Sequence, residues 1–165
     1  MLRRTLALGT IVLGAFTLSA CAPVVALGAA EDAADPACAA VTVRLPDEIG
    51  DGGVAFPARE TNAQATGAWG DPVAVVLHCG VPTPPPTAEF PCVTAPGGVV
   101  DWLVDDTRAP DYIFTSYGRS PAVSVVIDNT VISGVSVLDA VDNAVSQLPQ
   151  TGSCISIEDA PAAQQ

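Results

Sequence analysis

Hydrophobic positions along the chain follow strand spacing through most of its middle part. Residues 73–77 form an almost continuous apolar run, which is typical of a central buried strand. Residues 122–127 instead alternate, with Val123, Val125 and Ile127 at every second position. Residues 99–104 and 112–116 predict two more strands. Val supplies many of these positions, and β-branched residues fit a pleated, half-buried surface. We therefore expect a sheet at the core.

Helical spacing is clearest over residues 136–148, where apolar residues recur on one face and Pro149 ends the pattern. Ser136 to Asp139 resembles a capping box. Asp35 followed by Pro36 predicts the start of a short helix. Residues 58–70 fit either a helix or an irregular strand, the Pro-rich residues 80–91 predict an extended loop, and residues 151–157 predict an edge strand.

These elements predict an α+β fold. We expect a small antiparallel sheet of four or five strands with one or two helices packed on one face. The expected single domain covers residues 36–157, and residues 158–165 form a polar tail.

The first twenty residues have the pattern of an export signal. Arg3 and Arg4 precede an uncharged, mostly apolar run that is shorter than a membrane-spanning helix requires. Residues 18–21, Leu-Ser-Ala-Cys, are similar to the bacterial lipobox, which implies a diacylglycerol thioether on Cys21 and removal of residues 1–20. An ordinary signal peptide or an uncleaved anchor stays open. Residues 21–35, poor in large side chains, predict a flexible tether between lipid and domain.

The charge of the chain excludes several partners. Six Arg and no Lys stand against 18 acidic residues, and the net charge is −12. Removing Arg3 and Arg4 with the signal makes the charge more negative still. A chain this acidic lacks the basic face that nucleic acid requires, so no nucleic-acid partner is expected. Anionic lipid headgroups would repel it, so membrane attachment must be covalent or hydrophobic.

The cysteines predict two disulfides. If Cys21 carries lipid, Cys38, Cys79, Cys92 and Cys154 remain, an even number in an exported chain. Three connectivities are open. We favour Cys79–Cys92, which closes a short loop over the Pro-rich segment, and consequently Cys38–Cys154. Zinc is disfavoured because no Cys-x-x-Cys pair occurs, and a nucleophilic Cys is disfavoured because His78 is the only His.

The sequence carries no recognisable catalytic motif, and we expect no catalytic residues, metal or cofactor. It has no Gly-x-Ser-x-Gly elbow and no Lys for a phosphate-binding loop. Four acidic residues cluster around and after Trp102, at positions 101, 105, 106 and 111. Their spacing is not that of an EF-hand, so an acidic loop is favoured over a calcium site.

Two aromatic residues and one Arg form the candidate ligand site. Arg119, in Tyr117-Gly118-Arg119, is expected to pair with Asp71 or Asp101, and the alternative is a clamp for a carboxylate ligand. Trp69 either packs its loop on the sheet or lines a groove.

Five short segments occur here in the order found in one known family. They are Ala68-Trp69-Gly70-Asp71-Pro72, residues 76–82 (Val-Leu-His-Cys-Gly-Val-Pro), Asp101-Trp102-Leu103, residues 115–122 (Thr-Ser-Tyr-Gly-Arg-Ser-Pro-Ala) and Val137-Leu138. The chain resembles the actinobacterial envelope proteins of the domain of unknown function 3515 family. Members commonly have Arg where this chain has His78, which argues against a catalytic role for His78. The resemblance implies export, membrane tethering and two disulfides, but no activity.

We therefore expect a lipoprotein on the outer face of the cytoplasmic membrane that acts as a non-enzymatic accessory or interaction module, with an envelope protein as partner. The alternative is an extracytoplasmic protein that binds a small molecule or a cell-wall fragment. An envelope hydrolase is the third and least favoured hypothesis.

Overall fold

The computed structural model describes residues 23–154. The expected signal peptide, the lipobox and Cys21 lie outside the described residues, and so does the expected polar tail, residues 158–165. Within residues 23–154, no helix has the length and apolar character needed to cross a membrane.

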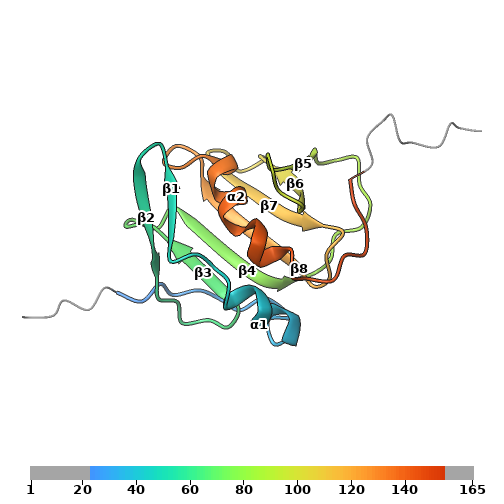
Figure 1. Ribbon diagram of the computed structural model, residues 1–165, viewed down its shortest axis with the longest axis horizontal. Coiled ribbons are helices and arrows are strands. Elements are labelled where there is room, and N and C mark those ends of the chain that lie inside the picture. The colour runs from blue at the N-terminus through green and yellow to red at the C-terminus, as the bar shows by residue number, and fades with distance from the viewer. Residues whose placement is uncertain (1–22, 155–165) are drawn as a thin grey trace, which may run out of the picture.

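The described chain is mostly sheet. Eight strands form one antiparallel sheet in the order β1-β2-β3-β4-β8-β7-β6-β5, which curls as an open half-barrel beside α2 (Figure 1). The strands are β1 (Glu48–Asp51), β2 (Val54–Arg59), β3 (Thr66–Trp69), β4 (Val75–Val81), β5 (Cys92–Thr94), β6 (Asp101–Asp105), β7 (Asp111–Tyr117) and β8 (Ala122–Asp128). The helices are α1 (Pro36–Thr42) and α2 (Gly134–Val145).

The expected α+β sheet of four or five strands is therefore wrong. The segments predicted as strands became β4, β6, β7 and β8, which form one half of the sheet. The sequence did not predict β1, β2 and β5, and it left residues 58–70, which contain β3, open between a helix and an irregular strand. β1, β3 and β5 have only three or four residues each, and Pro57 lies within β2. The sequences of these four strands lack the apolar–polar alternation that identifies a strand. They form strands because neighbouring strands supply their backbone hydrogen bonds.

Both expected helices are present. Asp35 caps α1, since its carboxylate accepts the Ala37 N–H at 2.7 Å. The start of α2 differs from the expected capping box, because Ser133 is the N-cap and makes no side-chain capping bond. The Ser136 hydroxyl instead donates to Asp51 Oδ1 at 2.8 Å. The expected edge strand around Cys154 is wrong for its described part, since residues 151–154 form no strand.

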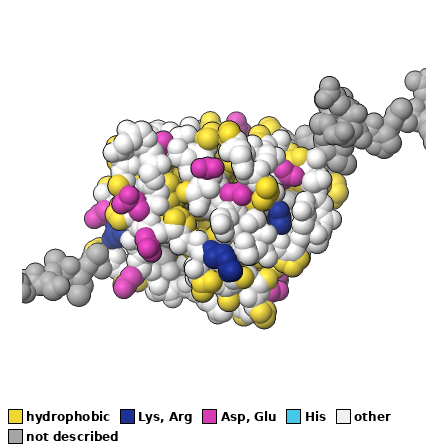
Figure 2. Space-filling model, in the orientation of Figure 1, with side chains coloured by type: hydrophobic (Ala, Val, Ile, Leu, Met, Phe, Trp, Pro, Cys, Tyr) yellow, Lys and Arg dark blue, Asp and Glu magenta, His cyan; other side chains and the backbone are white. Residues whose placement is uncertain are grey.

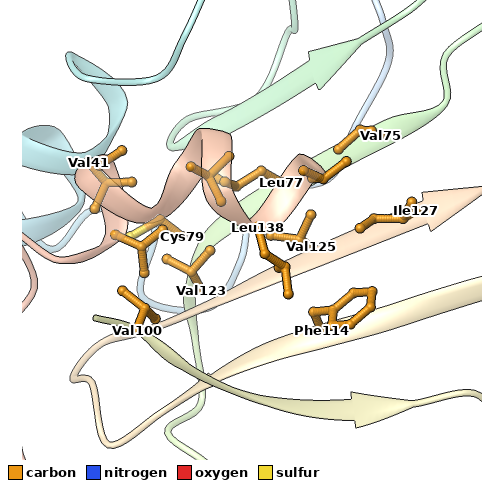
Figure 3. Close-up of a cluster of buried hydrophobic side chains, with 14 of the residues drawn as sticks. Val41, Val75, Leu77, Cys79, Val100, Phe114, Val123, Val125, Ile127 and Leu138 are labelled. Atoms are coloured by element: carbon orange, nitrogen blue, oxygen red, sulfur yellow. The ribbon is translucent and has the colours of Figure 1, made fainter. Parts of the chain in front are cut away.

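The core lies between the concave side of the sheet and α2. Val75 and Leu77 of β4 and Val125 of β8 are fully or almost fully buried, as is Leu138 of α2 (Figure 3). Register places Leu77 beside Val125, so alternate residues of the two central strands point to the same side. This alternation leaves the other face of the sheet to be covered by connecting segments.

The structure contradicts the favoured disulfide pairing. Cys38 is bonded to Cys79 and Cys92 to Cys154, with Cα–Cα distances of 5.7 and 6.0 Å. Cys79 lies in β4 and Cys92 in β5, and three strands separate β4 from β5 in the sheet. Closeness in sequence therefore does not bring these two residues together. Two disulfides indicate an oxidising, extracytoplasmic environment.

Residues 23–35, expected to be a flexible tether, lie along the domain. The Val25 N–H donates to Glu60 O at 2.8 Å and the Asp32 N–H donates to Gly80 O at 2.9 Å, while Ala33 is buried. Gly80 has a φ of +95°, and a Cβ there would lie 2.4 Å from the Asp32 backbone. Backbone hydrogen bonds hold this segment on the domain. Its small side chains give no sign of these bonds, so the composition predicted a flexible tether instead.

Candidate functional site

Arg119 is buried inside the domain. Its guanidinium donates to the carbonyls of Ser146 and Leu148 at 3.3 and 3.0 Å, and to Val99 O at 3.1 Å. The first two carbonyls follow α2, where the negative end of the helix dipole favours a cation. The expected ion pair with Asp71 or Asp101 is wrong: Asp71 pairs with Arg59, and Asp101 accepts hydrogen bonds from Thr94 and Cys154.

The structure does not bring Trp69, Tyr117 and Arg119 into one cleft. Trp69 is in β3 and Tyr117 in β7, with β4 and β8 between these strands. The Trp69 indole N–H donates to Pro46 O at 2.9 Å and its ring is buried. Tyr117 is half-buried beside a hollow of about 140 Å³ lined by Thr83 and Gly152, among others. Trp69 and Arg119 therefore have structural roles. The sequence left both a structural role and a ligand-binding role open for them.

The acidic residues of the described chain do not converge on a metal. Within residues 23–154, no three Asp, Glu, His or Cys side chains form a group able to hold an ion. Thr107 donates to Asp105 through its hydroxyl at 2.6 Å and through its backbone N–H at 2.9 Å. In the view of Figure 2, acidic side chains lie at several separate places. Of the four acidic residues from Asp101 to Asp111, Asp105 accepts hydrogen bonds from Thr107, and Asp101 accepts them from Thr94 and Cys154.

An apolar groove lies on the convex face of the sheet, between β6–β7 and the Pro-rich segment, residues 82–91. We call it the outer groove. It has a volume of about 250 Å³ and is lined by Pro84, Pro85, Thr87, Glu89, Phe90, Leu103, Asp105, Ile113 and Thr115. Leu103 pairs with Thr115 and Asp105 pairs with Ile113 in register, so these four side chains form one continuous floor. Sequence reasoning identified the Pro-rich segment as an extended loop but not the strand face that it covers.

The Pro-rich segment is fastened at both ends. The Thr83 hydroxyl donates to Arg119 O at 3.4 Å, and Pro91 O accepts the Val104 N–H at 2.9 Å. The adjoining Cys92 is held by its disulfide to Cys154. Because successive Pro residues favour an extended backbone without internal hydrogen bonds, the wall of the groove is preformed.

A second hollow lies on the concave face, between β5–β7 and the start of α2. Its volume is about 350 Å³. Val104, Phe114 and Leu138 line it together with Tyr112, and Asn129 supplies polar atoms at its margin. The Tyr112 and Phe114 rings stack with centroids 6.4 Å apart. We call it the inner hollow; no motif in the sequence predicts it, because its residues come from four separate elements.

Asp51 joins the β1–β2 turn to the start of α2. Its pKa is lowered from the ordinary value of 3.8, first because the Ser133 N–H donates to Oδ2 at 2.9 Å and second because the Ser136 hydroxyl donates to Oδ1. Because the pKa of Asp51 is lower in the folded state, the ionised carboxylate stabilises the fold at pH values above its ordinary pKa. This stabilisation is lost as pH falls through the folded-state pKa.

We therefore predict that Asp51→Asn flattens the acid limb of the stability curve. The free energy of unfolding of the parent should fall more steeply below the ordinary pKa of 3.8 than that of the variant. Urea unfolding at a series of acidic pH values measures both. Asp47→Asn, at an exposed neighbour, is the matched control. Parallel curves for the parent and Asp51→Asn would contradict the prediction.

Comparison with known proteins shows which family the chain belongs to. No curated protein and no solved structure matches the chain. One family model, described as a protein of unknown function (DUF3515), matches residues 4–153. The match includes the whole sheet, both helices and three of the four disulfide cysteines. This chain therefore belongs to the DUF3515 family.

Proposed function

We propose that the chain is a lipoprotein of the cell envelope, anchored on the outer face of the cytoplasmic membrane by lipid on Cys21. Its domain acts as a non-enzymatic interaction module. The outer groove receives an extended segment of an envelope protein that carries both apolar and basic side chains. The outer groove is the observation that carries this proposal, and the two disulfides support export.

The size of the outer groove favours side chains of a partner over a free ligand. Small-molecule sites commonly occupy about 300–1,000 Å³, whereas this groove has about 250 Å³. Its apolar floor, Leu103 and Ile113, and its wall, Pro84 and Phe90, provide contact area for one or two inserted side chains. A preformed wall also reduces the entropy lost on binding.

Charge specifies the second property of the partner. Glu89 and Asp105 line the groove, and Glu89 is exposed. The Thr107 hydroxyl, and then the Thr107 N–H, lower the pKa of Asp105, so this carboxylate is ionised at neutral pH. Both bonds use Oδ1, which leaves Oδ2 able to accept from a bound cation. A partner with Arg or Lys beside an apolar residue complements this groove.

A second candidate is the binding of a small apolar molecule in the inner hollow. Its volume of about 350 Å³ falls within the range of small-molecule sites. Stacked Tyr112 and Phe114 give it an aromatic wall.

Two short synthetic peptides test the outer groove. One alternates Leu and Arg, and its matched counterpart alternates Leu and Glu. We expect the Arg peptide to shift the amide resonances of β6 and β7, and the Glu peptide to shift none. Glu89→Arg should weaken the Arg peptide about two- to fivefold, as expected for an exposed ion pair. Glu48→Arg, at an exposed acid in β1, should leave binding unchanged.

Ile113→Thr tests the apolar floor, since Thr keeps the β-branch of the strand residue. Equal binding of both peptides, or shifts confined to the inner hollow, would contradict the proposed partner chemistry.

Anchoring is measured separately: Cys21→Ala should move the protein from the membrane fraction to the soluble fraction, and retention in the membrane would contradict the lipid assignment.

A further inference from the structure

We infer that the domain stands on the membrane by one defined end, the β2–β3 connection at residues 60–65, and that the outer groove faces away from the lipid. The inference rests on the proposed lipid at Cys21. It adds an orientation, which neither the anchor nor the groove specifies by itself.

The described chain is bound to the domain from its first residues. Arg59 donates to Pro23 O at 3.1 Å. Val25 accepts the Asn62 N–H through its carbonyl at 3.2 Å, and the Leu27 N–H donates to Asn62 Oδ1 at 2.8 Å. These bonds join the N-terminal segment to β2 and to the β2–β3 connection.

Arg59 is itself held in place, which makes this attachment rigid. Its side chain is 8 % exposed and lies 3.1 Å from Asp71 Oδ1, and it donates to Gly70 O at 3.0 Å. The guanidinium thus binds the first two residues of the β3–β4 turn and the backbone carbonyl of residue 23. A cation with several fixed partners keeps its position better than an exposed pair would.

The covalent distance from lipid to domain is short. Only Ala22 lies between Cys21 and Pro23 in the sequence. Two peptide units span at most about 7 Å. A free tether over residues 21–35, as the composition predicts, would have a mean span of about 21 Å. The structure removes nearly all of that length, because the segment is bound to the domain from residue 23 onward.

The outer groove belongs to the opposite end of the molecule. In Figure 1 the described chain begins, in blue, at one end of the long axis, and the yellow-green segment between β4 and β5 lies at the other end. That segment is the Pro-rich wall of the groove. A lipid attached beside residue 23 therefore places the bilayer at one end and presents the groove at the other.

Fluorescence quenching in vesicles tests this orientation. The full lipidated chain is reconstituted into phosphatidylcholine vesicles that carry a nitroxide on a fraction of their headgroups. A fluorescent amino acid replaces either Glu60 or Glu89, which are both exposed acids with no side-chain hydrogen bond among the described residues. We expect quenching at position 60 to be several-fold stronger than at position 89.

A spacer provides the matched control. About 16 Gly and Ser residues inserted between Ala22 and Pro23 give a mean span of about 22 Å and leave the lipobox intact. Quenching at position 60 should then fall toward the level at position 89. Equal quenching at the two positions in the vesicle-bound parent, or no effect of the spacer, would overturn the inference. Failure of the protein to partition into membranes would instead contradict the lipid anchor.

Discussion

Replacing Cys38 and Cys79 together by Ala is expected to lower the free energy of unfolding by about 4 kcal/mol or more. The disulfide closes a loop between residues separated by 41 positions, and the chain-entropy estimate for such a loop is about 4 kcal/mol. Both residues are fully buried. Loss of the two sulfurs from the core therefore adds to the entropic effect. Urea unfolding of the variant and the parent measures the difference.

The Cys92–Cys154 disulfide is the control that separates the effect of burial from the effect of loop closure. Cys92 and Cys154 are separated by 62 positions, so the loop-closure effect is similar, but Cys92 is exposed. Dithiothreitol should consequently reduce Cys92–Cys154 before Cys38–Cys79 in the native protein. Peptide mapping without reductant identifies both bonds directly. Recovery of Cys79 linked to Cys92 would contradict the connectivity and the strand order that separates those residues.

Arg119→Met is expected to destabilise the domain by about 3 kcal/mol or more. The substitution leaves three carbonyls without their donor, and an unsatisfied buried polar group costs about 1–3 kcal/mol. Arg119→Lys should recover only part of the loss, because an ammonium cannot reproduce the planar fork of a guanidinium. Thermal or urea unfolding measures both variants.

Arg44 provides the comparison for this prediction. It donates to Ala40 O at 2.9 Å but is exposed in the turn that follows α1. Arg44→Met should change the free energy of unfolding by no more than about 0.5 kcal/mol. If Arg119→Met lowered the free energy of unfolding by an equally small amount, the structural role assigned to the hydrogen bonds of Arg119 would be wrong.

The segments shared with the family contribute mainly to structure. Gly118 has a φ of +66°, and a Cβ there would lie 2.0 Å from Gly152 O, so its place between Tyr117 and Arg119 requires glycine. Arg119 then reaches the end of α2, and Trp69 bonds Pro46. A sequence cannot separate such roles from ligand binding, since both favour the same residue types.

The sequence alone determined the central elements. Strong apolar patterns identified β4, β6, β7, β8 and α2, because each has a face that must be buried regardless of its neighbours. The acid excess also follows from composition, as does the presence of four cysteines after Cys21. The export signal and lipid site are predictions from local pattern, and residues 1–22 lie outside the described structure.

Only the tertiary structure decided the remaining features. The short strands β1, β2, β3 and β5 exist because neighbouring strands supply their hydrogen bonds. Strand order then determined which cysteines meet, since it places β4 far from β5. It also placed the Pro-rich segment over β6 and β7 and the N-terminal segment beside β2. Each of these depends on contacts between residues distant in the chain, which local spacing does not encode.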